Sequence, residues 1–182
     1  MYPYGNLTRN GQPDTIGFYI LHEGVVGMHD GELIETNYGD IEDLSKEEIT
    51  REIQQNGWIG FTDKYWMSTL IPRAGQTFKM DQKYYSSSDN FEVWMRLPPI
   101  TVNKNERASV KTNLFVGAKE VNTIKFYQNS LDIENFVDSV DWGWFFYLTK
   151  PIFFLLDWFN SYTHNMGWSI ILLTLFIKTL LF

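Results

Sequence analysis

The stretch that most clearly indicates the fold class reads Arg107-Ala108-Ser109-Val110-Lys111-Thr112-Asn113-Leu114-Phe115-Val116. Apolar or β-branched residues occupy every second position, and charged or polar residues fill most positions between them. Side chains alternate between the two faces of a β-strand, so this pattern predicts a strand with one buried face and one largely wet face. We therefore expect Val110 and Leu114 to lie in a core between two packed sheets.

The rest of residues 1–140 carries shorter signals of the same kind. Asp30-Gly31 separates two apolar runs, at 25–28 and 32–34, and thereby predicts a β-hairpin. Residues 15–38 are strand-like throughout, with turns that contain glycine, and further strands are predicted at 76–85 and 91–97. These segments together predict a mainly β domain with antiparallel strands.

A few helices interrupt the predicted strands. Ser45 and Glu48 have the spacing of a capping box, and Gly57 is the expected end of the helix that they begin. A second short helix is expected at 120–129, followed by a linker at 131–140.

Composition separates the chain into two parts. The 182 residues have a formal net charge of −7, which argues against a nucleic-acid partner because phosphates require a basic surface. There is no cysteine, which excludes disulfides and thiolate metal sites. Residues 1–141 contain 21 acidic and 13 basic residues, whereas residues 142–182 contain three charged residues and four of the seven tryptophans. An acidic domain joined to an aromatic, nearly uncharged end is typical of a membrane-attached protein.

Motifs of catalysis or metal binding are not evident. His22-Glu23 and His29-Asp30 lie near turns and lack the spacing of a zinc or nucleophile motif. Trp58, Tyr65 and Trp66 would suit either a sugar-binding platform or a core. A group of carboxylates lacks the ligand spacing of a calcium loop, and we interpret it as the solvated start of the first predicted helix. Its members are Glu42, Asp43, Glu47, Glu48 and Glu52.

The last 41 residues predict two membrane-associated segments. Residues 151–162 have an aromatic apolar face but include polar residues, so we expect a helix that begins at Pro151 and lies in the membrane surface. Residues 167–182 are nearly all apolar and predict a membrane-spanning helix that is cut short, because about 15 residues cover only roughly 23 Å. Thr174 and Lys178 lie one turn apart on this helix. Lys178 either faces a protein interior or cavity, or extends its side chain to the headgroups.

Ordered motifs near the end of the chain resemble the YidC membrane protein insertases of Gram-negative bacteria. They include Asp141-Trp142-Gly143-Trp144-Phe145, Thr149-Lys150-Pro151, Asn165-Met166-Gly167-Trp168-Ser169 and Thr174-Leu175-Phe176-Ile177-Lys178. The soluble part resembles the first periplasmic domain of that family through Gly57-Trp58-Ile59-Gly60-Phe61-Thr62-Asp63 and related motifs. The resemblance spans nearly the whole chain but only part of a full insertase.

The resemblance implies a β-supersandwich periplasmic domain of the galactose-mutarotase type at 1–140, incomplete at its N-terminal side. An interfacial helix region at 141–166 and the start of a transmembrane helix at 167–182 would follow. Residues 1–166 would then lie on the periplasmic side of the bacterial inner membrane. The family inserts and folds membrane proteins without catalysis or cofactors, and its partners are nascent membrane proteins, Sec translocon components and lipids.

In that family a cation, usually arginine, projects from this helix into a hydrophilic groove that receives the incoming segment. Lys178 falls on that position and Thr174 on a polar groove position one turn earlier. Lysine keeps the positive charge but lacks the two-pronged guanidinium group. Two other classes fit the residues alone: a membrane-tethered β-sandwich that binds carbohydrate, and an envelope hydrolase whose titratable groups would converge in one cleft.

Overall fold

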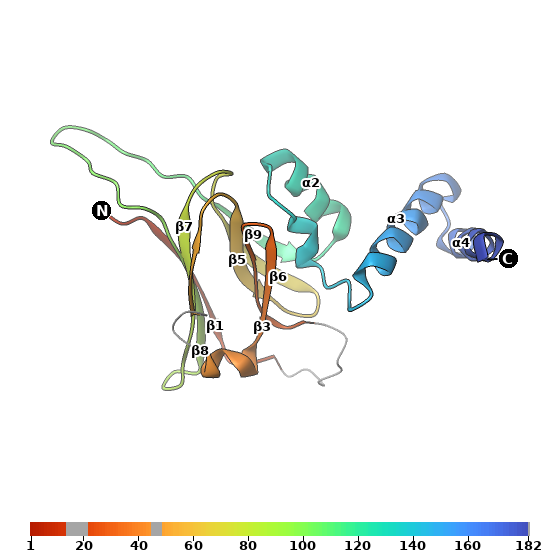
Figure 1. The fold of residues 1–182 in the computed structure, drawn as a ribbon, viewed down its shortest axis with the longest axis horizontal. Helices are drawn as coiled ribbons and strands as arrows, with labels where there is room; N and C mark the ends of the chain where they lie inside the picture. The colour runs from red at the N-terminus through yellow and green to blue at the C-terminus, as the bar shows by residue number, and fades with distance from the viewer. Residues whose placement is uncertain (14–21, 45–48, 182) are drawn as a thin grey trace. The chain divides into compact units, whose positions relative to one another are not determined.

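The computed structural model describes residues 1–13, 22–44 and 49–181. The chain forms two compact units, Met1–Asp141 and Trp142–Phe182. Within the described residues, the first unit contains nine β-strands, the helix α2 (Val121–Leu131) and the short 3-10 helices η1 (Tyr38–Asp43) and η2 (Phe136–Ser139). The prediction of a mainly β domain with a few helices is confirmed (Figure 1).

The strands form two antiparallel sheets. The four-stranded sheet has the order β1-β8-β7-β4, with β1 at Tyr4–Asn10, β8 at Asn90–Arg96, β7 at Phe78–Tyr85 and β4 at Thr50–Ile53. The five-stranded sheet has the order β3-β2-β5-β6-β9. Its strands are β2 (Gly24–His29), β3 (Glu32–Asn37), β5 (Gly57–Thr62), β6 (Trp66–Ile71) and β9 (Asn113–Ala118). The predicted hairpin is confirmed, since Asp30 and Gly31 connect β2 to β3.

The hydrophobic core lies between the two sheets. On β8 the buried side chains of Phe91, Val93 and Met95 alternate with more exposed neighbours, as a half-buried strand requires. They pack in one cluster with Ile59 and Phe61 of β5. The strands predicted at 76–85 and 91–97 are therefore present as β7 and β8.

A helical layer covers the other face of the five-stranded sheet. Trp58 of β5 is fully buried, and its indole Nε1 donates a hydrogen bond to the Glu134 carbonyl at 3.0 Å. Its ring meets Phe136 of η2 edge-on, with the centroids 5.3 Å apart. Phe136 and Ile133 are buried, so the segment predicted to be a linker at 131–140 is instead packed against the sheet. The prediction of a helix at 120–129 is confirmed by α2.

One strand prediction and one helix prediction are wrong. The strand predicted at 107–116 begins only at Asn113, and both Val110 and Leu114 are exposed rather than buried. The helix predicted to run from Ser45 to Gly57 is replaced at Thr50–Ile53 by β4, which pairs with β7 and buries Ile53 between the sheets. This pairing outweighs the local helix signals, of which Ser45 and Glu48 lie outside the described residues.

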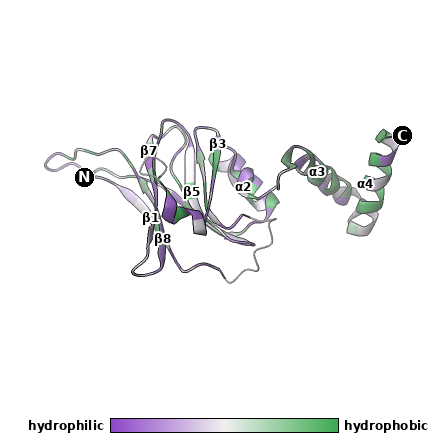
Figure 2. Cartoon of the chain, turned by 60° about the horizontal axis from the view of Figure 1, so that its bottom comes forward, coloured by the Kyte–Doolittle hydropathy of each residue, from purple (hydrophilic) through white to green (hydrophobic). Residues whose placement is uncertain are grey.

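The second unit is a pair of helices, α3 (Phe146–Thr163) and α4 (Met166–Leu181). Pro151 lies inside α3 rather than at its first position, because the helix starts five residues earlier. Much of both helices is coloured as hydrophobic in Figure 2. Among the described residues, no helix combines the length and hydropathy needed to cross a membrane.

Candidate functional site

The helix α4 carries both of the site residues predicted from the sequence, and its start is fixed by Asn165. The Asn165 side-chain oxygen accepts hydrogen bonds from the backbone N–H groups of Gly167 at 3.0 Å and Trp168 at 3.4 Å. An asparagine in this position satisfies N–H groups that have no partner within the helix. The cap therefore sets where α4 begins and which residues share each face.

One face of α4 packs against α3. The Thr163 and Ser169 hydroxyls lie 2.7 Å apart, and Ser169 is fully buried. Leu173 is buried on the same face, and Phe176 meets Phe159 of α3 with ring centroids 6.4 Å apart. A polar contact between Thr163 and Ser169 and apolar contacts further along α4 thus join the two helices.

Lys178 lies on the opposite face of α4. It follows Ser169 by nine positions, which at 3.6 residues per turn is a rotation of about 180° from the face that contacts α3. Both Lys178 and Thr174 are exposed, and with Gly167 and Ile171 they form one stripe along the helix. We call these four residues the lysine stripe. The structure therefore brings Thr174 and Lys178 together on a face that α3 leaves open.

The two polar side chains of the lysine stripe differ in their bonding partners. The Thr174 hydroxyl donates to the Ile170 carbonyl of its own helix at 2.7 Å, so it offers acceptor lone pairs rather than a free hydrogen. Within residues 1–13, 22–44 and 49–181, no ion pair involves Lys178.

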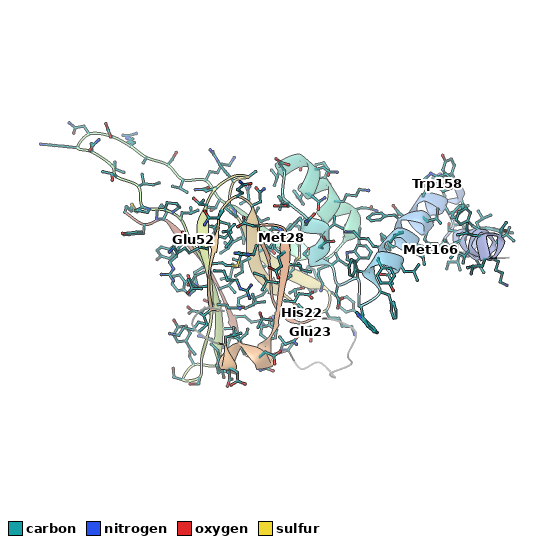
Figure 3. The ribbon with its side chains drawn as sticks, viewed as in Figure 1. His22, Glu23, Met28, Glu52, Trp158 and Met166 are labelled. Atoms are coloured by element: carbon teal, nitrogen blue, oxygen red, sulfur yellow. The ribbon has the colours of Figure 1, made fainter. Side chains whose placement is uncertain are left out.

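A second polar group lies in the first unit and escaped the sequence analysis. His22 is labelled in Figure 3. Its backbone N–H donates to the Asp141 carboxylate at 2.8 Å, and its ring nitrogens lie 3.0 Å from Asn37 Oδ1 and 2.9 Å from the Val25 carbonyl. Lys119 donates from Nζ to Thr62 Oγ1 at 2.9 Å. The sequence singled out His22 as a candidate, but no local pattern joins it to Asp141 or Lys119.

Burial controls the ionisation of this group. Burial raises the pKa of Glu35, the charges of His22 and Lys119 oppose that rise, and Asp141 adds to it. Burial also lowers the pKa of Lys119, although Asp141, Asp63 and nearby glutamates favour its charged form. Opposite charges that are partly buried and held by hydrogen bonds are typical of a structural ion cluster as well as of an active site.

The other candidates from the sequence have structural roles or lie apart. The Asp30 carboxylate accepts hydrogen bonds from the backbone N–H groups of Gln54 and Gln55, both at 2.9 Å, and of Asn56 at 3.2 Å. Burial acts to raise the pKa of Asp30, but these three bonds lower it below its usual value. Asp30 thus ties the β2–β3 turn to the segment after β4. His29 Nε2 lies 3.3 Å from the Glu52 carbonyl.

The aromatic and acidic candidates do not form a shared site. Trp58 is in the protein interior, whereas Tyr65 and Trp66 are exposed, so the three rings make no common platform. Glu52 lies on β4 and pairs with Lys79 at 3.6 Å, and Glu42 and Asp43 end η1, which corrects their assignment to a helix start. Glu47 and Glu48 lie outside the described residues. Across the part of the chain that the structure describes, no group of three potential metal ligands is found.

Comparison with known proteins identifies the family. The sequence profile of the YidC periplasmic domain matches residues 1–155. The chain belongs to this YidC family. The resemblance drawn from the sequence motifs is thereby confirmed, and it extends through the first unit and into α3.

Similar full-length proteins are named membrane protein insertase YidC. That of Dinoroseobacter shibae is 52% identical over all of this chain, which covers 31% of that protein. The Paracoccus denitrificans protein is 48% identical over 99% of this chain, and the chain covers 29% of its length. The protein of a Ruegeria species is 47% identical over 99% of this chain, and the chain covers 31% of its length. The YidC-family chain described here therefore spans about a third of the length of these relatives.

Proposed function

We propose that this chain is part of a membrane protein insertase and that the lysine stripe contacts the segments that the insertase brings into the bilayer. The first unit would be a portion of the periplasmic domain, with the galactose-mutarotase-like supersandwich that the resemblance implies. Residues 1–140 would form that domain, 141–166 an interfacial region and 167–182 the start of a transmembrane helix. This arrangement places residues 1–166 on the periplasmic side of the bacterial inner membrane.

The observation that carries the proposal is the position of Lys178 on α4. A lysine near the middle of a bilayer costs roughly 2.5–3.5 kcal/mol on insertion scales, so such residues usually face a protein interior or a water-filled cavity. The face that contacts α3 is occupied by Ser169 and Leu173, and Lys178 lies about 180° from it. A groove built on the open face would contain this charge and the acceptor oxygen of Thr174.

The work done by such a groove is physical rather than covalent. Polar groups of an incoming segment lose hydrogen bonds to water as they enter hydrocarbon, and each loss costs several kcal/mol. A fixed cation and a hydroxyl oxygen replace part of that hydration. Nascent membrane proteins are the expected substrates, lipids and Sec translocon components the expected neighbours, and no step requires a cofactor or nucleic acid.

The test moves the charge rather than only removing it. In the full-length protein, Lys178→Leu combined with Thr179→Lys shifts the ammonium group by about 100° around α4 while keeping the composition nearly the same. Cells depleted of their own insertase are complemented with wild type, Lys178→Arg, Lys178→Ala, Lys178→Glu and the shifted variant. Insertion rates are measured for substrates with and without acidic residues in the translocated segment, and membrane levels are compared by blot.

Lys178→Arg should insert normally, because it keeps the charge in place. Lys178→Ala and the shifted variant should slow acidic substrates by about tenfold, equivalent to about 1.4 kcal/mol, and Lys178→Glu should slow them most. Thr174→Val and Thr179→Val form a matched pair, since both hydroxyls donate to the carbonyl four residues earlier, at 2.7 and 2.8 Å. Only Thr174→Val should reduce insertion. Normal rates for the shifted variant and Lys178→Glu at normal levels would show that Lys178 only reaches for headgroups.

A further inference from the structure

The first unit holds its own last residue, Asp141. The Asp141 carboxylate accepts the 2.8 Å hydrogen bond from the backbone N–H of His22, a residue 119 positions earlier in the chain. The ring of His22 is itself held between Asn37 Oδ1 and the Val25 carbonyl, so the segment that supplies this N–H is fixed. A hydrogen bond to an ionised carboxylate is roughly twice as strong as one between neutral groups. Asp141 is therefore attached to the sheet domain and not only adjacent to it in sequence.

Charge adds to this attachment. Asp141 and Lys119 line one open pocket, together with Tyr65 and Val140. Burial lowers the pKa of Lys119, and the charge of Asp141 is the largest of those that oppose this shift. A carboxylate that favours the charged form of a lysine is in turn attracted by that charge. Asp141 thus has a cationic neighbour in addition to its N–H donor.

The next residue, Trp142, is attached to the second unit instead. Its carbonyl accepts a hydrogen bond from Thr149 Oγ1 of α3 at 2.7 Å. Its ring packs against Phe153 and Phe154 of α3, with centroids 5.4 and 6.0 Å away. The Lys150 ammonium group lies 6.0 Å from the centroid of the same ring, within the range of a cation–π contact. Trp142 therefore moves with α3.

No spare residue separates the two attachments. Asp141 is the last residue of the first unit and Trp142 is the first residue of the second. Consecutive Cα atoms lie about 3.8 Å apart across a peptide bond. Boundaries between domains more often fall in flexible, exposed linkers. Rotation about the bonds next to this peptide is still allowed, so the two attachments limit the distance between the units rather than their orientation.

We propose that Asp141 and Trp142 form a one-bond tether between the two units, with Asp141 as the positioning residue on the side of the first unit. The inference rests on the proposal that the chain is part of an insertase whose α3 lies in the membrane surface. The tether allows the periplasmic domain to turn about one point but not to move away from α3. A displacement of the domain therefore reaches α3 without slack, and it reaches the lysine stripe on α4 through the contact between Thr163 and Ser169.

The test adds slack without changing either attachment. In the full-length protein, Gly-Ser is inserted between Asp141 and Trp142, and the control is the same insertion after Asn105, which lies in an exposed turn. Spin labels on cysteines introduced at Asn129 of α2 and Ser161 of α3, both exposed, report the distance between the units. The 182 residues contain no other cysteine, and any outside them is replaced first. Asp141→Ala and Asp141→Glu are measured with the same labels.

The insertion between Asp141 and Trp142 should extend the longest populated distances by up to about 7 Å, the span of two extended residues. Asp141→Ala should shift them in the same direction. Asp141→Glu, which keeps the carboxylate, and the control insertion should match wild type. Unchanged distances after the Gly-Ser insertion at 141–142 would overturn the proposal, because added slack cannot be hidden at a working tether. The insertion variant also bears on Asp141 if Asp141→Ala fails to fold.

Membrane protein insertion is measured in parallel to separate this inference from the role of Lys178. The Gly-Ser insertion at 141–142 should slow substrates with and without acidic residues alike, since it changes the position of α3 and not the charge of the lysine stripe. The Lys178 variants should act mainly on acidic substrates. Wild-type insertion rates for the Gly-Ser variant, at normal membrane levels, would refute the positioning role.

Discussion

Replacing Trp58 with phenylalanine should loosen the helical layer from the five-stranded sheet. The change removes the donor to the Glu134 carbonyl, a 3.0 Å bond, and part of the edge-on contact with Phe136. A partly buried carbonyl left without its partner costs about 1–3 kcal/mol, and a lost aromatic contact costs about 0.5–1.5 kcal/mol. Since phenylalanine retains one ring in the site, we expect a total of about 2–4 kcal/mol.

The assay is hydrogen exchange of α2 and η2 in the full-length protein, because their amides report the opening of this layer. An opening cost lowered by 2–4 kcal/mol corresponds to exchange about 30- to 700-fold faster. The control is Trp66→Phe, which changes an indole that is 63% exposed on the neighbouring strand. If Trp58→Phe accelerates exchange no more than Trp66→Phe does, the indole does not hold the layer in place, and the packing argument is refuted.

Two further predictions concern pH and the membrane. Because the pKa of Glu35 is raised in the folded protein, its contribution to stability is fully present below the usual value of 4.5 and is lost as pH rises through the folded pKa. The stability of Glu35→Gln, measured by thermal unfolding, should therefore fall less than that of wild type as pH rises over this range. Glu32→Gln on the same strand is the control. Parallel stability curves for wild type and Glu35→Gln would contradict the prediction. Spin labels at Leu155 and Phe159 of α3 should report shallow apolar surroundings and a label at Asp157 aqueous ones, if α3 lies in the membrane surface, whereas equal depth at all three positions would exclude that orientation.

Local patterns predicted the fold well where strand pairing is itself local. Asp30-Gly31 specified the β2–β3 hairpin because both strands and the turn lie within 14 residues of sequence. The segment at Thr50–Ile53 was mispredicted because its strand state depends on β7, some 30 residues away, and on burial of Ile53 between the sheets. Leu114 illustrates a different limit: the alternation of residues 107–116 predicted that it is buried, but it lies on β9, the last strand in the order of its sheet, and is 58% exposed.

The candidate site also has parts that the sequence predicts and parts that require the structure. Thr174 and Lys178 share a helix face for reasons of spacing alone, so the sequence was sufficient to place them together. Their position opposite α3 required the structure, because it depends on the contact between Ser169 and Thr163. The group of His22, Glu35, Lys119 and Asp141 could not be predicted, since its members come from segments that only the sheet brings close.

The Asp30 carboxylate also bears on the order in which the strands can assemble. Its bonds join the β2–β3 turn, across only 24 to 26 residues, to residues 54–56, which connect β4 of the other sheet to β5. By contrast, Tyr4 of β1 must find Arg96 of β8 across most of the first unit. The entropy of closing a loop grows with the logarithm of its length, so capturing β1 costs about 1 kcal/mol more than forming the Asp30 bridge. The two sheets can thus be linked by a short-range contact before the first strand of the chain is in place.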